Sequence, residues 1–408
     1  MAKNKNNIPI QRFPQFTQGK GWDYVNANEL FAPIVNKNHN SDLPVLAITQ
    51  DQGAVPREMI DYNVIVSEKS IAGYKVVEIG DFIISLRSFQ GGIEYSNFEG
   101  LCSPAYIVLR KKNDTICNDF YRHYFKSWPF IQDLNRNLEG IRDGKMVSYQ
   151  QFSEILIPYP PFAEQQKIAD CLSSIDSYTL CIDEKVEQLK THKKSLLQKL
   201  FPQGGKTIPE YRFPEFEKDG SWEEKELGEL ILEIAEFTSR RNNVPLYSLT
   251  IEDGVSPKTD RYERNFLVKK EGDNFKVVHP DDFVSNPMNL RFGAIGYNKE
   301  SFKVCVSGYY DVFRFKDKGT SSFWINYMKG NWALDMYDKI ATGSLYEKRR
   351  VHFSNLLRMK LLVPKYSERL KISEYLSSME EVIGFYSEKA SLLEQHKKGL
   401  MQQLFPKA

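Results

Sequence analysis

Basic and amide side chains lie beside glycine and aromatic residues at several places in the sequence, a combination typical of loops that contact nucleic acid. Arginine can form two hydrogen bonds to a guanine edge, glutamine or asparagine can do so to adenine, and serine, threonine and backbone amides can bind phosphates. A basic loop is more often plain solvated surface, but these clusters recur at corresponding places in two halves of the chain. The predicted DNA-binding residues are Arg87, Ser88, Gln90, Gly91, Arg142 and Lys145 in the first half, and Asn289, Arg291, Thr342, Ser344, Arg349 and Arg350 in the second.

Patterns of catalytic residues are incomplete in this sequence. Gly204-Gly205-Lys206-Thr207 resembles the end of a phosphate-binding loop, but that motif needs a glycine where the chain has Leu200. Tyr159-Pro160-Pro161-Phe162 resembles the tetrapeptide of amino-methyltransferases, which begins with Asn or Asp to bind the amino group of the target base. The histidines pair with no Ser, Cys or carboxylate at catalytic spacing, and the cysteines form no CxxC pair. We therefore predict no catalytic residue and no metal site.

The second half of the sequence repeats the first at an offset of about 200 residues, and such a repeat defines the architecture. Arg12-Phe13-Pro14-Gln15-Phe16 returns as Arg212-Phe213-Pro214-Glu215-Phe216. The run SPAYIVLR, residues 103–110, returns as SGYYDVFR, residues 307–314. The repeat predicts two globular units of the same fold, each followed by one long helix.

Each globular unit is predicted to combine strands with helices. Short runs rich in β-branched and aromatic residues, such as Val76–Leu86, are bounded by Gly, Asn or Asp and predict strands. Tyr121–Leu138 and Ser322–Ile340 carry apolar residues at helical spacing. The expected units are therefore mixed α and β.

Two long helices are predicted from apolar residues that alternate at spacings of three and four, which is a coiled-coil period. The first runs from Ala163 to Pro202, with Thr179 and Lys193 at its two polar seam positions. A seam needs a partner helix, and the same pattern near the C-terminus supplies one within the chain. The predicted seam residues are Ile168, Leu172, Ile175, Ile182, Val186, Leu189, Leu196 and Leu200 in the first helix, and Ile372, Leu376, Met379, Ile383, Leu393, Leu400 and Leu404 in the second.

Charge and hydropathy limit the classes of protein to consider. The 55 basic and 53 acidic residues give a net charge of +2, so affinity for nucleic acid must come from local patches. No run approaches the ~18 apolar residues that cross a bilayer, and the N-terminus lacks the apolar core of a signal peptide. We expect a cytoplasmic protein with reduced cysteines and no membrane partner.

Two runs at the starts of the long helices carry a family resemblance. IPYPPFAEQQKIADCLSSID from Ile157 and LLVPKYSERLKISEYLSSME from Leu361 resemble the two conserved helical regions of the specificity subunit of type I restriction-modification systems. The implied fold is α+β: two repeated mixed α/β target-recognition domains joined by two long helices packed as an antiparallel coiled coil. The expected boundaries are 1–158 and 204–362 for the domains, and 159–203 and 363–408 for the helical spacers.

The resemblance implies a non-catalytic subunit in a prokaryotic cytoplasm that reads an asymmetric, two-part site on double-stranded DNA, one domain per half. The helices would set the gap between the halves. Two modification subunits that bind S-adenosylmethionine and methylate adenine would dock on it, and two motor-nuclease restriction subunits, which use ATP and Mg, would join for cleavage. No cofactor is expected on this chain itself. The alternatives are a diverged DNA methyltransferase or nuclease, and a scaffold whose globular units bind peptides.

Overall fold

The structure, a computed structural model, describes residues 7–40, 42–60, 71–136, 147–238, 244–258, 275–345 and 349–406. The chain divides into two compact units, and the division cuts through both long helices. The first unit is Met1–Asp183 with Glu388–Ala408, and the second is Glu184–Ser387. Each unit therefore contains one globular half of the sequence, the start of one long helix and the end of the other. The predicted domain boundaries stay a prediction.

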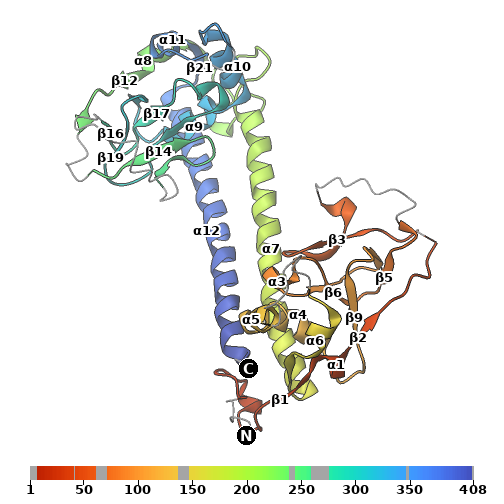
Figure 1. Ribbon diagram of the computed structural model, residues 1–408. Helices are drawn as coiled ribbons and strands as arrows, with labels where there is room; N and C mark the ends of the chain where they lie inside the picture. The colour runs from red at the N-terminus through yellow and green to blue at the C-terminus, as the bar shows by residue number, and fades with distance from the viewer. Residues whose placement is uncertain are drawn as a thin grey trace. The chain divides into compact units, whose positions relative to one another are not determined.

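The first unit consists of short strands and helices followed by the start of a long helix (Figure 1). Its strands are β1 (Asp23–Asn26), β2 (Phe31–Ile34), β3 (Leu46–Thr49), β4 (Gly53–Pro56), β5 (Lys75–Val77), β6 (Phe82–Ile84), β7 (Glu94–Tyr95), β8 (Gly100–Cys102), β9 (Ile107–Lys111) and β10 (Leu156–Tyr159). Its helices are α1 (Ala27–Leu30), α3 (Ser88–Gly91), α4 (Asn118–Tyr124), α5 (Trp128–Arg136), α6 (Tyr149–Ser153) and the long α7 (Phe162–Leu200), with 3₁₀ turns η1 (Pro14–Phe16) and η2 (Arg57–Met59).

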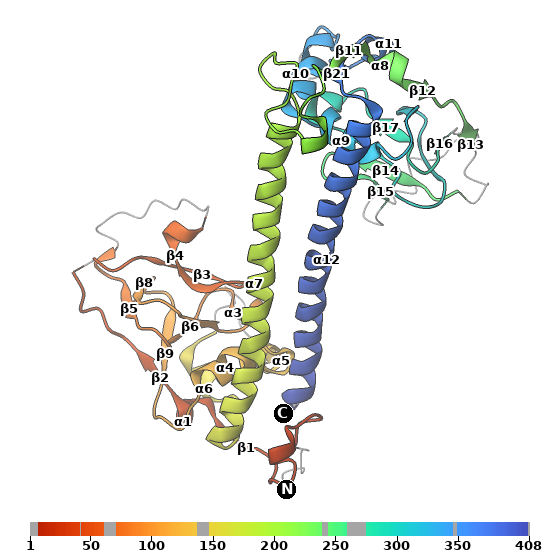
Figure 2. The same cartoon turned by 180° about the vertical axis from the view of Figure 1, so that it is seen from behind.

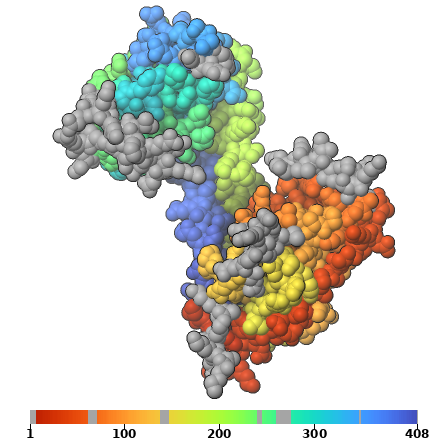
Figure 3. Space-filling model, in the orientation of Figure 1, coloured from red at the N-terminus to blue at the C-terminus, as the bar shows by residue number. Residues whose placement is uncertain are grey.

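An antiparallel sheet of order β2-β9-β6-β7 forms the centre of this unit. Strand β6 is buried on both faces. Because side chains alternate along a strand, its neighbouring residues enter two different cores. Phe82 and Ile84 enter the core that contains α4, and Ile83 enters a smaller core against β3 and β4. Helix α4 lies between the sheet and α7 (Figures 1 and 2). In the space-filling view these elements close into one packed body (Figure 3).

The core of the first unit is completed by the ends of two helices that are far apart in sequence. Ile168 and Leu172 come from the start of α7, and Leu404 comes from the end of the C-terminal helix α12 (Tyr366–Leu404). The ring of Phe405 lies 5.6 Å from that of Phe120 in α4. Leu404 and Phe405 are thus core residues of the first globular half.

The second unit repeats these elements. Its strands are β11 (Glu223–Glu226), β12 (Ile231–Glu233), β13 (Phe237–Thr238), β14 (Tyr247–Thr250), β15 (Gly254–Pro257), β16 (Phe275–Val278), β17 (Phe283–Ser285), β18 (Ile295–Tyr297), β19 (Val304–Ser307), β20 (Asp311–Phe315) and β21 (Lys360–Val363). Its helices are α8 (Leu227–Leu230), α9 (Ser321–Met328), α10 (Asn331–Ile340) and α11 (Phe353–Leu357), with 3₁₀ turns η3 (Pro214–Phe216) and η6 (Leu290–Phe292).

The second sheet has the matching order β12-β20-β17-β18. Strand β17 again divides its side chains between two cores, with Phe283 in the larger and Val284 in the smaller. Leu200 from the end of α7 and Leu376 from the start of α12 complete the larger core. Phe201 stacks on Tyr327 of α9 at a ring distance of 5.0 Å. The two units are therefore built on one plan.

Within each unit the two helices run antiparallel. In the first, Asp176 of α7 pairs with Lys397 of α12, while Tyr178 accepts a hydrogen bond from Lys389, so rising numbers on one helix meet falling numbers on the other. In the second, the seam lysine Lys193 of α7 binds the carboxylate of Glu380 of α12 at 2.7 Å. The predicted α+β class with two long, mutually packed antiparallel helices is confirmed.

The predicted seam residues are buried or partly buried in the structure. Those nearest the helix ends also belong to the globular cores described above. In the described part of the chain, no helix is both long enough and apolar enough to cross a membrane.

Candidate nucleic-acid interface

A short turn between β6 and β7 presents the first predicted cluster. Helix α3 occupies this turn, and Arg87 and Gln90 are exposed on it. Ser88 is only 1% exposed, and its Oγ accepts a hydrogen bond from the Ser85 amide at 2.9 Å, which shapes the turn. Gly91 is partly buried. Arg87 and Gln90 are therefore the members of this cluster that are open to a ligand.

The base of this turn is held by a lysine that the sequence reasoning missed. Lys126 Nζ donates to the carbonyls of Gln50 and Gly91, each at 3.1 Å, and to Glu94 Oε2 at 2.6 Å. Glu94 is 1% exposed, and its burial raises the pKa of its carboxyl group despite the nearby lysine. The α3 turn is thus tied to the segment that follows α4.

Gly92 ends α3 in a backbone conformation suited to glycine. Its φ is 84°, and a Cβ atom there would lie 2.0 Å from the Phe125 carbonyl oxygen. The close approach of these two backbones requires glycine. Gly293, with a φ of 87°, ends the corresponding turn in the second unit.

The corresponding turn in the second unit contains η6, with Asn289 exposed before it. Arg291 is 6% exposed and directs its guanidinium to Asp338 of α10, with Nε 2.6 Å from Oδ1. Arg349 donates to the backbone carbonyls of Asp338 and Ala341. The structure therefore brings Arg291 and Arg349 together, both in contacts that hold the loops around α10.

The remaining predicted residues of the second unit are solvent-exposed. Thr342 and Arg350 exchange backbone hydrogen bonds of 2.9 Å in both directions, so these two residues lie side by side. Thr342, Ser344 and Arg350 are all exposed. The Val351 amide donates to the Pro287 carbonyl, so Arg350 and Val351 lie beside the η6 turn. The predicted contacts Arg142 and Lys145 lie outside the described residues.

Exposed aromatic residues accompany both turns. Trp128 is 62% exposed at the start of α5, which packs against α3. Phe292 is 53% exposed within η6, with the Arg291 guanidinium 5.5 Å from its ring centre. Aromatic rings next to basic side chains are suited to stacking on bases. The exposure of Trp128 could not be read from its position in an amphipathic helix.

Lysines stand at the same place in the two repeats. Lys329 follows α9 as Lys126 follows α4, and its Nζ donates to the Ile251 carbonyl at 2.9 Å. Burial lowers the pKa of Lys329. The signal for these lysines was available in the sequence, because both lie at the end of a repeated helix.

Each domain is fixed to the start of a long helix by a buried ion pair. Arg12 binds Glu164 of α7 through two contacts of 2.6 Å. Arg212 binds Glu368 of α12 through contacts of 2.8 Å and 2.6 Å. Arg369 of the second copy, which aligns with Gln165 of the first, is buried and binds Asp317 and the Pro364 carbonyl.

Groups of three or more metal-binding side chains are absent from the part of the chain that the structure describes. The arrangement offers hydrogen-bond donors, positive charge and exposed rings on turns of two similar domains. This chemistry suits recognition of a polyanion whose bases present hydrogen-bonding edges.

Comparisons with known proteins agree with recognition of a nucleic acid. Residues 19–191 match the family model described as type I restriction modification DNA specificity domain. Two proteins of Methanocaldococcus jannaschii are similar over most of the chain. The putative type I restriction enzyme MjaX specificity subunit is 23% identical over 363 residues, covering 83% of this chain and 80% of that protein. The type I restriction enzyme MjaVIII specificity subunit is 24% identical over 352 residues, covering 81% and 79%.

A solved structure shares the fold. The crystal structure of the type I restriction-modification system S subunit from M. genitalium matches with a TM-score of 0.57 and 12% identity, over 98% of this chain and 99% of that one. Residues 19–191 thus match a type I DNA specificity domain, and most of the chain is similar to type I specificity subunits. The resemblance predicted from the sequence is confirmed.

Proposed function

We propose that this chain is the DNA specificity subunit of a type I restriction-modification complex. The observation that carries the proposal is the match of residues 19–191 to a DNA specificity domain, in a chain whose second unit repeats the same fold. Each domain reads one half of a bipartite, asymmetric site on double-stranded DNA. The diverged methyltransferase or nuclease is not favoured, because the similar proteins are named specificity subunits.

The partners of this function supply the chemistry. Two modification subunits carrying S-adenosylmethionine dock on the chain, and two restriction subunits with ATP and Mg join them for cleavage. The chain itself binds no cofactor and catalyses no step. A protein with internal twofold repetition can present equivalent faces to two copies of one partner, which is the physical support for this stoichiometry.

Within the first unit, Arg87 and Gln90 read bases. Both are exposed on a turn whose backbone is fixed by Lys126 and Ser88. A bidentate contact of this kind discriminates bases by about 1–3 kcal/mol. Replacing both with alanine should relax methylation at one half-site while the other half-site stays unchanged.

The experiment is methylome sequencing of cells that express the full system with the variant chain. The matched control replaces Lys37 and Asn38, an exposed basic and amide pair in the same unit, with alanine. An unchanged methylation motif with the Arg87 and Gln90 variant would refute these contacts. Exchange of residues 1–155 for another such domain should change one half-site only, and a change in both halves would refute the modular function.

The gap between the half-sites depends on the long helices. Insertion of seven residues in both α7 and α12 preserves each seam and should lengthen the gap. The same methylome measurement gives the gap directly, and an unaltered gap would refute this role. Methyl transfer or DNA cleavage by the purified chain alone would favour the enzyme alternative.

A further inference from the structure

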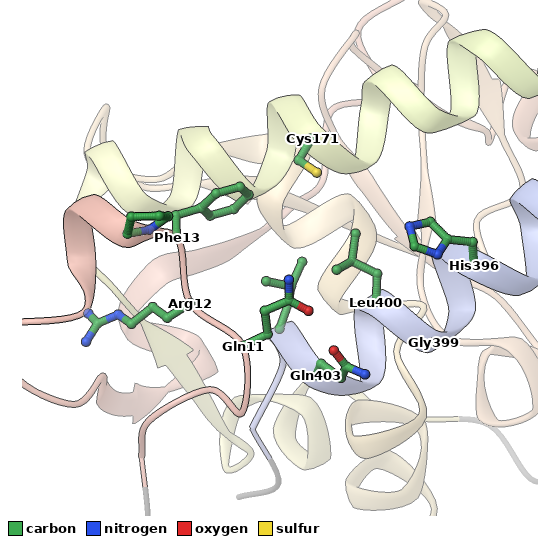
Figure 4. Close-up of a pocket in the computed structure, with 10 residues that line it drawn as sticks. Gln11, Arg12, Phe13, Cys171, His396, Gly399, Leu400 and Gln403 are labelled. Atoms are coloured by element: carbon green, nitrogen blue, oxygen red, sulfur yellow. The ribbon is translucent and has the colours of Figure 1, made fainter.

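A cavity of about 400 Å³ lies in the first unit, where the entering chain meets the start of α7 and the end of α12 (Figure 4). This volume is in the range of sites that bind small molecules. In the close-up, Phe13 and Cys171 face the space from one side, and Leu400 faces it from the other. Gln11 and Gln403 also line the cavity.

The repeat shows which side chains occupy the equivalent positions in the second unit, where Tyr211 is 43% and Tyr375 38% exposed. The aligned segments place Tyr211 where the first unit has Gln11, and Tyr375 where it has Cys171. The Phe213 ring contacts both tyrosines edge to face, with centroid distances of 5.8 Å to Tyr211 and 5.6 Å to Tyr375. The second unit thus has a cluster of three rings. Of these, the first unit keeps only the phenylalanine.

The framework around the ring cluster is otherwise the same in both units. A lysine of the long helix lies over the phenylalanine ring in each: Lys167 is 5.8 Å from Phe13, and Lys371 is 5.9 Å from Phe213. The backbone hydrogen bond between the entering segment and the end of the other helix also recurs, at 3.1 Å and 2.9 Å. The first unit therefore keeps the frame but lacks the two rings that pack on the phenylalanine in the second unit.

We propose that this cavity binds one small aromatic molecule of the size of phenol. The ring takes the place of the missing tyrosines and packs edge to face on Phe13, as the second unit does with its own side chains. The Cys171 sulfur provides a polarizable contact for the ring. Gln11 and Gln403 offer amide groups that can bond a hydroxyl group. The site goes beyond DNA recognition and does not depend on it.

The probe is 4-methylphenol, which is the tyrosine side chain as a free molecule. Cys171 lies at the wall of the cavity, and Cys181 lies exposed farther along the same helix as an internal control. The full chain is treated with iodoacetamide, and the alkylation rate of each cysteine is followed by mass spectrometry. With a dissociation constant on the order of 1 mM, 5 mM probe should slow Cys171 alkylation about sixfold, in a saturable way. Cys181 should keep its rate.

Filling the cavity from the chain itself provides the second test. Cys171→Tyr should raise the melting temperature and abolish further stabilisation by 4-methylphenol, whereas Cys181→Tyr should leave the probe's effect unchanged. Cys171→Ser keeps the space open and should keep probe-induced stabilisation. The proposal is overturned by equal slowing at both cysteines, by equal protection with cyclohexanol, or by undiminished stabilisation of the Cys171→Tyr variant.

Discussion

Replacing Arg12 with alanine tests the ion pair that fixes the first domain to its helix. The Arg12 and Glu164 side chains are 6% and 0% exposed, and two contacts of 2.6 Å join them. The hydrogen bond to Glu164 raises the pKa of Arg12, so the guanidinium stays charged. Removing one partner of a buried ion pair predicts a cost of about 3–5 kcal/mol, which is consistent with the loss of two charge-assisted hydrogen bonds at about 1.5–3 kcal/mol each.

The assay is hydrogen exchange measured by mass spectrometry, because it reports the opening free energy of each unit separately. Peptides from the first unit should lose protection in the Arg12→Ala variant, and peptides from the second should not. Arg212→Ala should give the reverse pattern through Glu368. The paired replacement Arg12→Met with Glu164→Leu should recover most of the loss, since it leaves no buried charge. A cost below about 1 kcal/mol, as for a surface pair, would refute the reasoning.

Three further perturbations have outcomes set by single contacts. Burial lowers the pKa of His123 to about 3. In the unfolded chain this histidine takes up a proton below about pH 6.5, so the free energy of unfolding of the first unit should fall by about 1.4 kcal/mol between pH 7.5 and 5.5. His123→Gln should remove that pH dependence in urea unfolding. Lys193→Glu should destabilise the second unit by about 1 kcal/mol through repulsion with Glu380, and adding Glu380→Lys should restore it in the same assay. Gly92→Ala should cost at least about 3 kcal/mol, from strain and overlap with the Phe125 carbonyl, measured by thermal unfolding.

Matched controls separate these effects from general damage. His192 is exposed on α7, and His192→Gln should leave the pH dependence unaltered. Lys190 pairs with Glu187 on the helix surface, and its charge reversal should cost less than about 0.5 kcal/mol. Gly220 has open space around its Cβ position, so Gly220→Ala should stay within about 0.5 kcal/mol. Effects of the controls as large as those of the tested variants would contradict all three assignments.

The repeat and the helical period were readable from the sequence because both follow from residue types and their order along the chain, without knowledge of tertiary contacts. Short β-branched runs gave the strands, and the spacing of Ile168 and Leu172 gave the helix. Burial of polar side chains was not readable in the same way. Arg291 looked like a reader of bases, yet its partner Asp338 lies on another helix 47 residues away. Ser88 likewise bonds to a backbone amide within its own turn. The role of Arg291 depends on a tertiary contact, which no single-sequence spacing encodes, and that of Ser88 depends on the exact conformation of its turn.

For the candidate site, too, some features could be predicted from the sequence and others could not. Gln90 and Asn289 are exposed, as expected for amide side chains that bind DNA. The sequence was sufficient here because a surface amide needs no partner from a distant part of the chain. Trp128 was missed because its helix has one apolar face, on which a tryptophan would ordinarily be buried. Its 62% exposure is therefore informative, as a large apolar side chain left in solvent beside a basic turn.

Each long helix contributes residues to both cores. Helices α7 and α12 are each 39 residues long. Leu172 near the start of α7 enters the first core and Leu200 at its end enters the second, while α12 gives Leu376 to the second core and Leu404 to the first. Neither globular half of the sequence therefore holds all of its own core. Lengthening one helix alone would shift its seam residues or withdraw its end from a core, so equal length in the two helices is a condition for folding both units.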